Sequence, residues 1–260
     1  MRLFNLTVIV LLSVLLFLSG CASSPEESDE TKGWAAEKFY QEAATALKGG
    51  DYETAIKYFE KLEARYPFGR YAQQAQLETA YAYYKFNEPE SAIAAADRFI
   101  KLHPRNERVD YAYYLRGLAS FPASNNVIEN VVGRDPTQLD EAASRRSFNY
   151  FAELVKQFPN SEYVKDANSR MIYLRNSLAQ YELNVAKFYF KRGAYVATAN
   201  RAKYIVDNYQ NTPSMPAALK LMAAAYQKMG IKGLADDTLR VLDKNQPQKS
   251  TTPQDETTEN

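Results

Sequence analysis

Residues 49–67 read GGDYETAIKYFEKLEARYP, and this stretch decides the fold class. Its apolar residues recur at helical spacings, which places them on one face of an amphipathic helix: Tyr52, Ala55, Ile56, Phe59, Leu62 and Tyr66. The glycine pair at 49–50 would close a preceding helix, and Pro67 would end this one. The stretch therefore predicts a unit made of a helix, a glycine turn, a second helix and an aromatic–proline stop.

The aromatic–proline stop returns along the chain. An apolar residue, three further residues and then an aromatic or His residue before Pro occur at 62–67, 99–104 and 154–159, and a weaker copy lies at 205–213. The first two copies are 37 residues apart. A period in the mid-thirties with two helices per unit resembles the tetratricopeptide repeat (TPR). We therefore predict an all-α, TPR-like solenoid of about five helix pairs, over 34–67, 71–104, 109–159, 163–209 and 213–245.

Two of these units depart from the common length. The third contains an insertion over 119–139, rich in turn residues. In the fourth, residues 161–192 contain neither Gly nor Pro. This predicts one helix of about 30 residues, although two helices with a hidden break would fit the same stretch. We expect N-terminal repeats 1–3 over 34–159 and C-terminal repeats 4–5 over 160–245.

The N-terminus indicates the compartment. Residues 1–20 read MRLFNLTVIVLLSVLLFLSG, with a basic start, a short apolar run and small residues before Cys21, the single cysteine. This is the pattern of a signal peptide, and LSGC resembles the lipobox of bacterial lipoproteins. Cys21 is therefore the predicted lipidation site, and a secretory signal with a chance cysteine is the alternative. By the same resemblance, Ala22 favours the outer membrane.

The polar segments at both ends of the fold differ in composition from the repeats. Residues 21–33 are predicted to form the acylated cysteine and a flexible tether, because residues 22–33 are polar and carry helix breakers. Residues 246–260 are predicted to form a disordered tail, because they have no large apolar residue.

The composition of the chain argues against nucleic-acid binding, a Cys/His metal site and catalysis. With 32 Lys and Arg against 31 Asp and Glu, it gives no electrostatic case for nucleic acid. One Cys and one His exclude a disulfide framework and a Cys/His zinc site. The His, His103, stands at a repeat stop, where helix-end packing is the simplest role. No nucleotide-binding or hydrolase motif occurs. We predict that the protein is not an enzyme and has no cofactor and no metal.

Four motifs carry a resemblance to a known family. They are RYPFGRYAQQAQLETAYAYYK (65–85), DRFIKLHP (97–104), DYAYYLRGL (110–118) and KRGAYVATANR (191–201). Together with the lipobox and the repeats, they resemble the outer-membrane β-barrel assembly lipoproteins of the BamD (ComL) family. The insertion departs from the family's usual loop and keeps only its GRDP.

The resemblance implies a scaffold of the β-barrel assembly machinery. Such a protein is lipid-anchored in the inner leaflet of the outer membrane of a Gram-negative bacterium and faces the periplasm. It docks with its C-terminal repeats on the POTRA domains of the Omp85-type barrel BamA, alongside other assembly lipoproteins. It helps to fold and insert unfolded outer-membrane proteins by binding their targeting segments with its N-terminal repeats.

The RYPFGRY motif, residues 65–71, supplies the predicted substrate-peptide residues Arg65, Tyr66, Phe68 and Tyr71. Aromatic rings suit the alternating apolar residues of a β-barrel strand. For Tyr66 and Phe68, packing between the first two units is the alternative role.

The RGAYVATANR motif, residues 192–201, supplies the predicted BamA-binding residues Arg192, Tyr195 and Arg201. The two arginines lie nine residues apart across a glycine turn, so we expect that they do not share one helix. Arg201→Glu is expected to weaken docking while leaving helical content intact. A surface position in water, or a salt bridge within the chain, is the alternative for these residues.

Two other functions fit the same lipobox and repeats. A TPR lipoprotein could tether peptidoglycan-remodelling enzymes or pilus components. A lipoprotein enzyme such as a muramidase would need paired carboxylates in a cleft, and helical repeats leave no obvious place for one.

Overall fold

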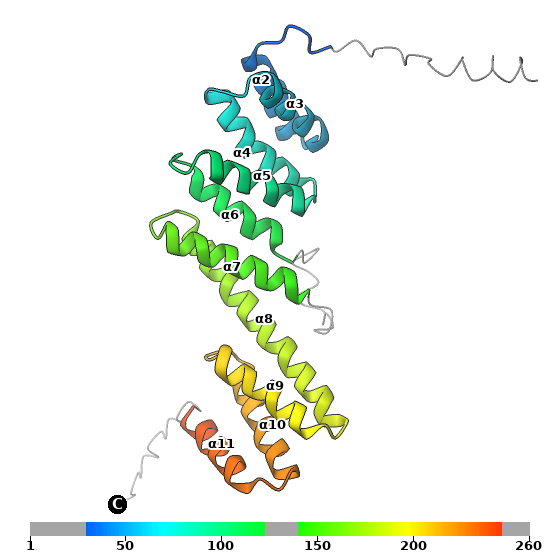
Figure 1. Cartoon of the computed structure of the whole chain (residues 1–260), viewed down its shortest axis with the longest axis vertical. Helices are drawn as coiled ribbons and strands as arrows, with labels where there is room; N and C mark the ends of the chain where they lie inside the picture. The colour runs from blue at the N-terminus through cyan, green and yellow to red at the C-terminus, as the bar shows by residue number, and fades with distance from the viewer. Residues whose placement is uncertain (1–29, 123–139, 246–260) are drawn as a thin grey trace, which may run out of the picture.

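The computed structural model describes residues 30–122 and 140–245, and within them the secondary structure consists of helices (Figure 1). These run in chain order as α2 (Ala36–Gly49), α3 (Tyr52–Arg65), α4 (Arg70–Lys85), α5 (Pro89–Leu102), α6 (Val109–Ser120), α7 (Glu141–Gln157), α8 (Val164–Lys191), α9 (Tyr195–Asn208), α10 (Met215–Lys228) and α11 (Lys232–Lys244).

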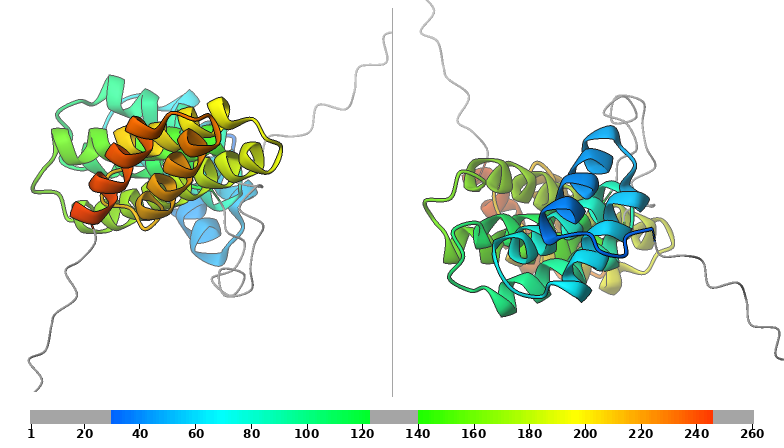
Figure 2. Two further views of the ribbon diagram at one scale, coloured as in Figure 1. Left: turned by 90° about the horizontal axis from the view of Figure 1, so that it is seen from below. Right: turned by 90° about the horizontal axis from the view of Figure 1, so that it is seen from above.

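Each helix packs on the next one in the chain, so the described helices form five consecutive pairs. The pairs follow one another along an extended molecule, with α2 near one end and α11 at the other (Figure 1). Views along the long axis show the pairs stacked over one another (Figure 2). The predicted all-α, TPR-like solenoid of five helix pairs is confirmed.

The repeat stop has one geometry in all four units that carry it. The backbone N–H of each stop residue donates to the carbonyl four residues earlier, at N–O distances of 2.7–2.8 Å, for Tyr66, His103, Phe158 and Tyr209. The stop rings then turn back onto the core. His103 packs on Phe99, with ring centroids 5.2 Å apart, and its Nε2 lies 2.7 Å from Gln76 Oε1. The packing role predicted for His103 is confirmed.

Glycine permits a close approach of helices in the third unit. A Cβ atom at Gly117 of α6 would lie 2.3 Å from the ring of Phe151 on α7, a distance at which atoms overlap. The Gly117 carbonyl also accepts a 2.8 Å hydrogen bond from the buried Ser147 hydroxyl. The expected insertion over 119–139 joins these two helices, and its residues 123–139 lie outside the described part of the chain.

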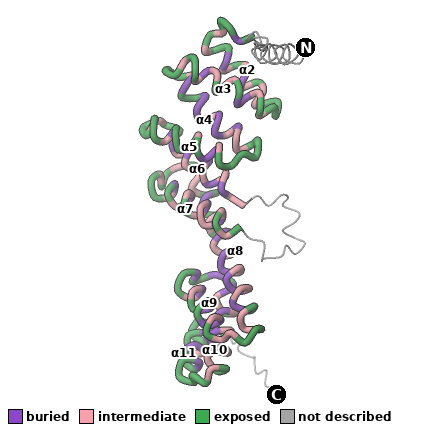
Figure 3. Tube along the Cα trace, turned by 45° about the vertical axis from the view of Figure 1, so that its right-hand side comes forward, coloured by how far each residue is buried: buried purple, intermediate pink, exposed green. Residues whose placement is uncertain are grey.

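Helix α8 is continuous over 28 residues, or about 42 Å at 1.5 Å per residue. The single long helix is therefore confirmed, and the alternative of two helices is wrong. A stripe of buried residues runs along it (Figure 3). Leu174 belongs to the core shared with α7, whereas Leu178 belongs to the core shared with α9 and α10. One turn of α8 thus separates the core of the N-terminal repeats from that of the C-terminal repeats.

The predicted signal peptide (1–20), Cys21, most of the tether and the tail (246–260) lie outside the described residues. Among the residues that are described, no helix combines the length and apolar character needed to cross a membrane.

Candidate partner-binding surfaces

Two residues of the RYPFGRY motif face the segment that precedes α2. Arg65 Nη1 donates to the Thr31 carbonyl at 2.6 Å, and the Tyr66 hydroxyl donates to the Trp34 carbonyl at 2.8 Å. The Arg65 guanidinium also lies over the Phe39 ring, 5.0 Å from its centroid. Thr31 is buried as a result. Arg65 and Tyr66 therefore hold residues 31–34 against the end of α3. The Tyr66 ring also packs against a core cluster that includes Ala72 and Ala75 of α4, so the packing alternative for Tyr66 has contacts in both units.

The next residues of the motif differ from one another in exposure. Phe68 has 90% of its surface exposed, the largest value among the exposed large apolar residues of the described chain. Gly69 has a φ of 98°, which suits glycine and allows the sharp entry into α4. Tyr71 is half-buried against Tyr40, with ring centroids 5.5 Å apart, and its hydroxyl accepts a bond from the exposed Arg70. Phe68 is thus the motif residue most available to a partner.

The RGAYVATANR motif begins at the turn between α8 and α9. Arg192 follows the last residue of α8 and is exposed, with its guanidinium 4.6 Å from the Phe188 ring centroid. Tyr195 opens α9 and meets the Phe190 ring edge-on at 5.5 Å. Tyr195 and the exposed Val196 line a shallow hollow whose other side is Met229.

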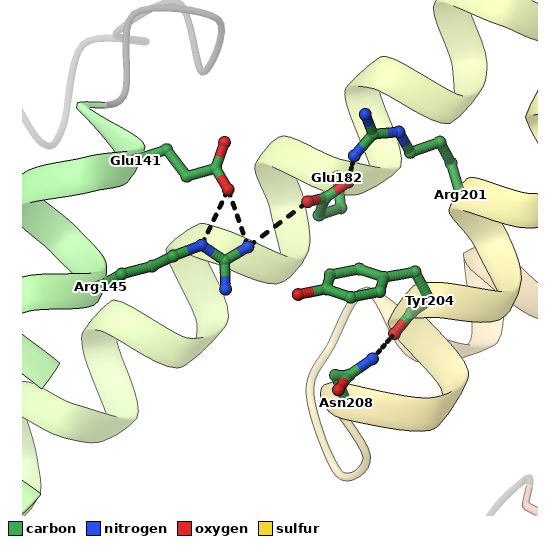
Figure 4. Close-up of polar contacts among 6 residues, drawn as sticks. All are labelled: Glu141, Arg145, Glu182, Arg201, Tyr204 and Asn208. Atoms are coloured by element: carbon green, nitrogen blue, oxygen red, sulfur yellow. Dashed lines mark hydrogen bonds and ion pairs between the residues drawn. The ribbon is translucent and has the colours of Figure 1, made fainter. Parts of the chain in front are cut away.

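Arg201 lies six residues along α9 from Tyr195, about 9 Å at the helical rise. Its Nη1 donates to Glu182 Oε2 of α8 at 2.9 Å (Figure 4). The side chain of Arg201 is 46% exposed, whereas that of Glu182 is 2% exposed. The salt-bridge alternative for Arg201 is therefore present within the chain. Arg192 lies just after α8 and Arg201 lies within α9, so the two arginines do not share one helix, as expected.

Glu182 has a second arginine partner on the opposite side. Arg145 of α7 places Nη2 3.6 Å from Glu182 Oε1 and makes 2.8 Å contacts to Glu141 (Figure 4). Burial alone would lower the pKa of Arg145, but the hydrogen bond to Glu141 and electrostatic interactions with Tyr209, Tyr204 and Glu141 raise it. The four residues Glu141, Arg145, Glu182 and Arg201 form the Glu182 cluster. Its formal charges cancel, as burial of a carboxylate requires.

Sequence reasoning missed Glu182 and Arg145. A signal for Glu182 was available, because it lies four residues from Leu178 and from Ala186, on the buried stripe of α8. An acidic residue on an apolar stripe needs a partner, but the partners come from α7 and α9 and have no local pattern.

A tyrosine cluster between α6 and α8 was also missed. The rings of Tyr114 and Tyr163 stack with centroids 4.8 Å apart, and Tyr111 lies 5.3 Å from Tyr163. The Tyr114 hydroxyl donates to Asp166 at 2.5 Å. Burial and this carboxylate raise the pKa of Tyr114 to about 12. The cluster ties the third unit to the start of α8.

These features define a class of protein. A TPR-type solenoid presents exposed aromatic and arginine side chains at its turns, and its described residues hold no group of His, Cys, Asp or Glu arranged for a metal. Residues 33–241 match the family model described as YfiO, outer membrane lipoprotein. The chain therefore belongs to the YfiO family of outer-membrane lipoproteins.

Individual relatives cover almost the whole chain. It is 44% identical to the outer membrane protein assembly factor BamD of Neisseria meningitidis serogroup A, over 92% of this chain and 91% of that protein. It is 35% identical to the protein of the same name from Vibrio cholerae serotype O1, over 90% and 96%. These relatives are named as assembly factors and not as enzymes, in line with the prediction of a non-enzymatic scaffold.

Similarity to solved structures is weaker. The chain is 14% identical to the TPR2AB domain in the TPR2AB-domain:pHSP90 complex of yeast Sti1, with a TM-score of 0.43, over 81% of this chain and 78% of that one. The assignment of the fold rests on the helix order and packing described above.

Proposed function

We propose that this chain is a lipid-anchored periplasmic scaffold of the β-barrel assembly machinery, and that it helps to fold and insert outer-membrane proteins. The observation that carries the proposal is the 44% identity to a protein named as an outer membrane protein assembly factor, over nearly the full length of both chains. Because the match spans every repeat, we extend to this chain a role in which the N-terminal and the C-terminal repeats both bind partners.

Anchoring is assigned to Cys21. Acyl chains on its thiol and amine would hold the protein at the inner leaflet of the outer membrane, since more than one chain is needed for stable attachment. From Cys21 to Thr31 the tether spans at most about 35 Å. Thr31 is itself buried against the fold through Arg65. The N-terminal repeats therefore work close to the membrane surface.

Docking is assigned to the C-terminal repeats, with the POTRA domains of a BamA-type Omp85 barrel as the partner. Charge supports this choice. Within 183–235 the single acidic residue is Asp207, against eight basic ones: Lys187, Lys191, Arg192, Arg201, Lys203, Lys220, Lys228 and Lys232. The whole chain has a net charge of only +1. A locally positive surface speeds and orients association with an acidic partner.

We assign Arg192, Tyr195 and Arg201 as the docking residues. Arg192 is exposed and steadied by the Phe188 ring, and Tyr195 borders the hollow beside Met229. Arg201 keeps nearly half of its side chain in solvent despite its bond to Glu182. Planar guanidinium groups pair with carboxylates in a bidentate manner, which favours arginine over lysine here.

Substrate contact is assigned to the N-terminal repeats, with Phe68 as the leading residue. A fully exposed phenylalanine can accept the apolar side chains of an unfolded β-strand. Tyr71 lies three residues further along the motif, while Arg65 and Tyr66 bond to the backbone of residues 31–34.

The test is a pull-down of the tagged lipoprotein from outer membranes in mild detergent, read by mass spectrometry. A roughly stoichiometric Omp85-type barrel, with other assembly lipoproteins, is the expected result. Peptidoglycan-remodelling enzymes or pilus components in place of the barrel would overturn the proposal and leave a tethering lipoprotein.

A further inference from the structure

We infer that Glu182 is a positioning residue for docking: it holds the Arg201 guanidinium in the orientation that receives an acidic side chain of the partner. The inference rests on the proposed function, because it concerns the same surface of α9. It adds a residue that no partner can touch, since 2% of the Glu182 side chain is exposed.

Burial is what fixes Glu182. The residue lies on the stripe of α8 that packs into the C-terminal core, with Leu178 and Leu183 buried beside it. A side chain enclosed in this way has few rotamers open to it, so its two oxygens have defined positions. Arg145 occupies the side of Oε1, at 3.6 Å, and Arg201 occupies Oε2, at 2.9 Å.

Arg201 is therefore half anchored and half free. One of its five N–H donors is bonded to Glu182 through Nη1, and the other end of the guanidinium points away from Glu182 (Figure 4). A solvent-exposed arginine loses much rotamer freedom when a partner binds it. Glu182 imposes that loss beforehand, so a partner carboxylate meets an arginine already in place.

Arg145 ensures that the buried Glu182 carboxylate keeps a counter-ion when Arg201 binds a partner. If Arg201 shares its charge with a partner carboxylate, Glu182 keeps Arg145 as its second counter-ion. Arg145 is in turn held by Glu141 on α7. The orientation of Arg201 thus depends on three helices, and not on α9 alone.

A comparison pair lies in the N-terminal repeats. Arg146 of α7 forms a two-pronged contact with Glu90 of α5 at 2.7 and 3.2 Å, but 71% of the Glu90 side chain is exposed. A carboxylate that is exposed to this extent is expected to contribute little to the orientation of its partner. Glu90→Gln therefore serves as a matched control for Glu182→Gln.

The experiment is a double-mutant cycle on docking. Six proteins, produced as residues 21–260 with Cys21→Ser so that no acyl chain is attached, carry no further change, Glu182→Gln, Arg201→Met, both of these, Glu90→Gln, or Glu90→Gln with Arg201→Met. Their affinities for the purified periplasmic domain of the Omp85-type barrel are measured by interferometry, and melting curves establish that each is folded. We expect Glu182→Gln to weaken binding about 5-fold, which lies within the range of coupling energies measured between residues in direct contact. In the Arg201→Met background it should have no further effect, and Glu90→Gln should have none in either.

The outcomes separate the two proposals. If Arg201→Met weakens binding but Glu182→Gln has no effect, or the same effect in both backgrounds, the positioning role is wrong and the docking surface stands. If Arg201→Met binds like the parent, or the parent does not bind, the docking assignment itself fails and the positioning role fails with it.

Discussion

The RYPFGRY motif of the N-terminal repeats and the RGAYVATANR motif of the C-terminal repeats both offer arginine and tyrosine at a helix turn, but they use them differently. In the first, Arg65 and Tyr66 bond to backbone carbonyls of residues 31–34 and hold the chain entry in place. In the second, Arg201 bonds to a buried carboxylate and keeps a free end in solvent.

The difference teaches that the bonding partner decides the role of an arginine. An arginine that donates to a backbone carbonyl of residues 31–34 helps to hold that segment against the fold. A buried carboxylate instead holds the side chain at the surface with donors to spare. Stability should therefore respond to the first motif through its hydrogen bonds, and to the second through its charges.

The largest expected effect is a difference between the N-terminal and C-terminal repeats in their unfolding at alkaline pH. Burial, followed by a hydrogen bond to Glu60, raises the pKa of Tyr83 to about 12, and burial with Asp166 does the same for Tyr114. Burial also raises the pKa of Tyr111. In the C-terminal repeats, Tyr209 has a pKa raised to about 12 by burial. The shifted tyrosines thus gather mainly in the N-terminal repeats.

The sign follows from linkage. Tyrosines of the unfolded chain lose their protons near pH 10, while these folded ones keep them to about pH 12. Their contribution to stability is complete below pH 10 and is lost as the pH rises to 12. We expect Trp34 fluorescence to report unfolding first, before a second probe, Tyr226→Trp in a Trp34→Phe chain. Earlier loss at the C-terminal probe would contradict the comparison, and Tyr114→Phe should flatten the pH dependence at Trp34.

The largest effect of a single substitution is expected at the Glu182 cluster. Arg201→Glu would place a second carboxylate beside the buried Glu182 and leave Arg145 as the one cation for both. We expect a loss of about 2 kcal/mol in the free energy of unfolding, and a fall of about 4–8 °C in melting temperature. The sequence predicts that this variant docks more weakly with its helices intact. That prediction then applies only below the lowered melting temperature of the variant. Arg201→Met is the cleaner variant for binding.

Arg146→Glu is the control in the other half. Its partner Glu90 is exposed, so the same reversal should cost less than about 1 kcal/mol. Equal melting temperatures for the two variants would mean that burial of Glu182 does not set the cost.

The repeat architecture could be predicted because its signals are local. Apolar spacing, glycine turns and the recurring stop all lie within a few residues of what they determine, and they gave the five helix pairs and the continuous α8. The first of the described helices, α2, begins at Ala36, two residues after the expected start of the first unit at Trp34. Residues 31–34 form a turn there, which is held by Arg65 and Tyr66.

The candidate surfaces were harder to predict, since their partners are distant in sequence. Tyr66 and Trp34 are 32 residues apart, and a backbone carbonyl leaves no mark in the side-chain pattern. Glu182 could have been noticed on the apolar stripe of α8, but its link to Arg145 spans 37 residues. Exposure, which distinguishes Phe68 from Tyr66 two residues away, depends on which ring the turn directs inward.

A smaller effect should come from the hydroxyl of Tyr66. Tyr66→Phe removes the bond to the Trp34 carbonyl and leaves a half-buried acceptor without it, at a cost of about 1 kcal/mol. Hydrogen exchange read by mass spectrometry should show faster exchange in residues 31–39. Tyr71→Phe is the matched control, because its hydroxyl bonds only to the exposed Arg70 among the described residues, and it should leave that exchange unchanged. Similar acceleration in both variants would remove the structural distinction drawn within the motif.

The smallest effect on stability is expected at Phe68, the residue that we propose as the leading contact for the substrate peptide. Phe68→Ser removes an almost fully exposed ring, so the free energy of unfolding should change by less than about 0.5 kcal/mol. Binding of a fluorescent peptide from the C-terminal strand of an outer-membrane protein, followed by anisotropy, should nevertheless weaken, because an aromatic contact contributes about 1 kcal/mol. Phe188→Ser removes a half-exposed ring from the C-terminal repeats and should leave peptide affinity unchanged. If the two variants lose affinity equally, the peptide is not held by the N-terminal turn, and the two motifs do not divide substrate and partner between them.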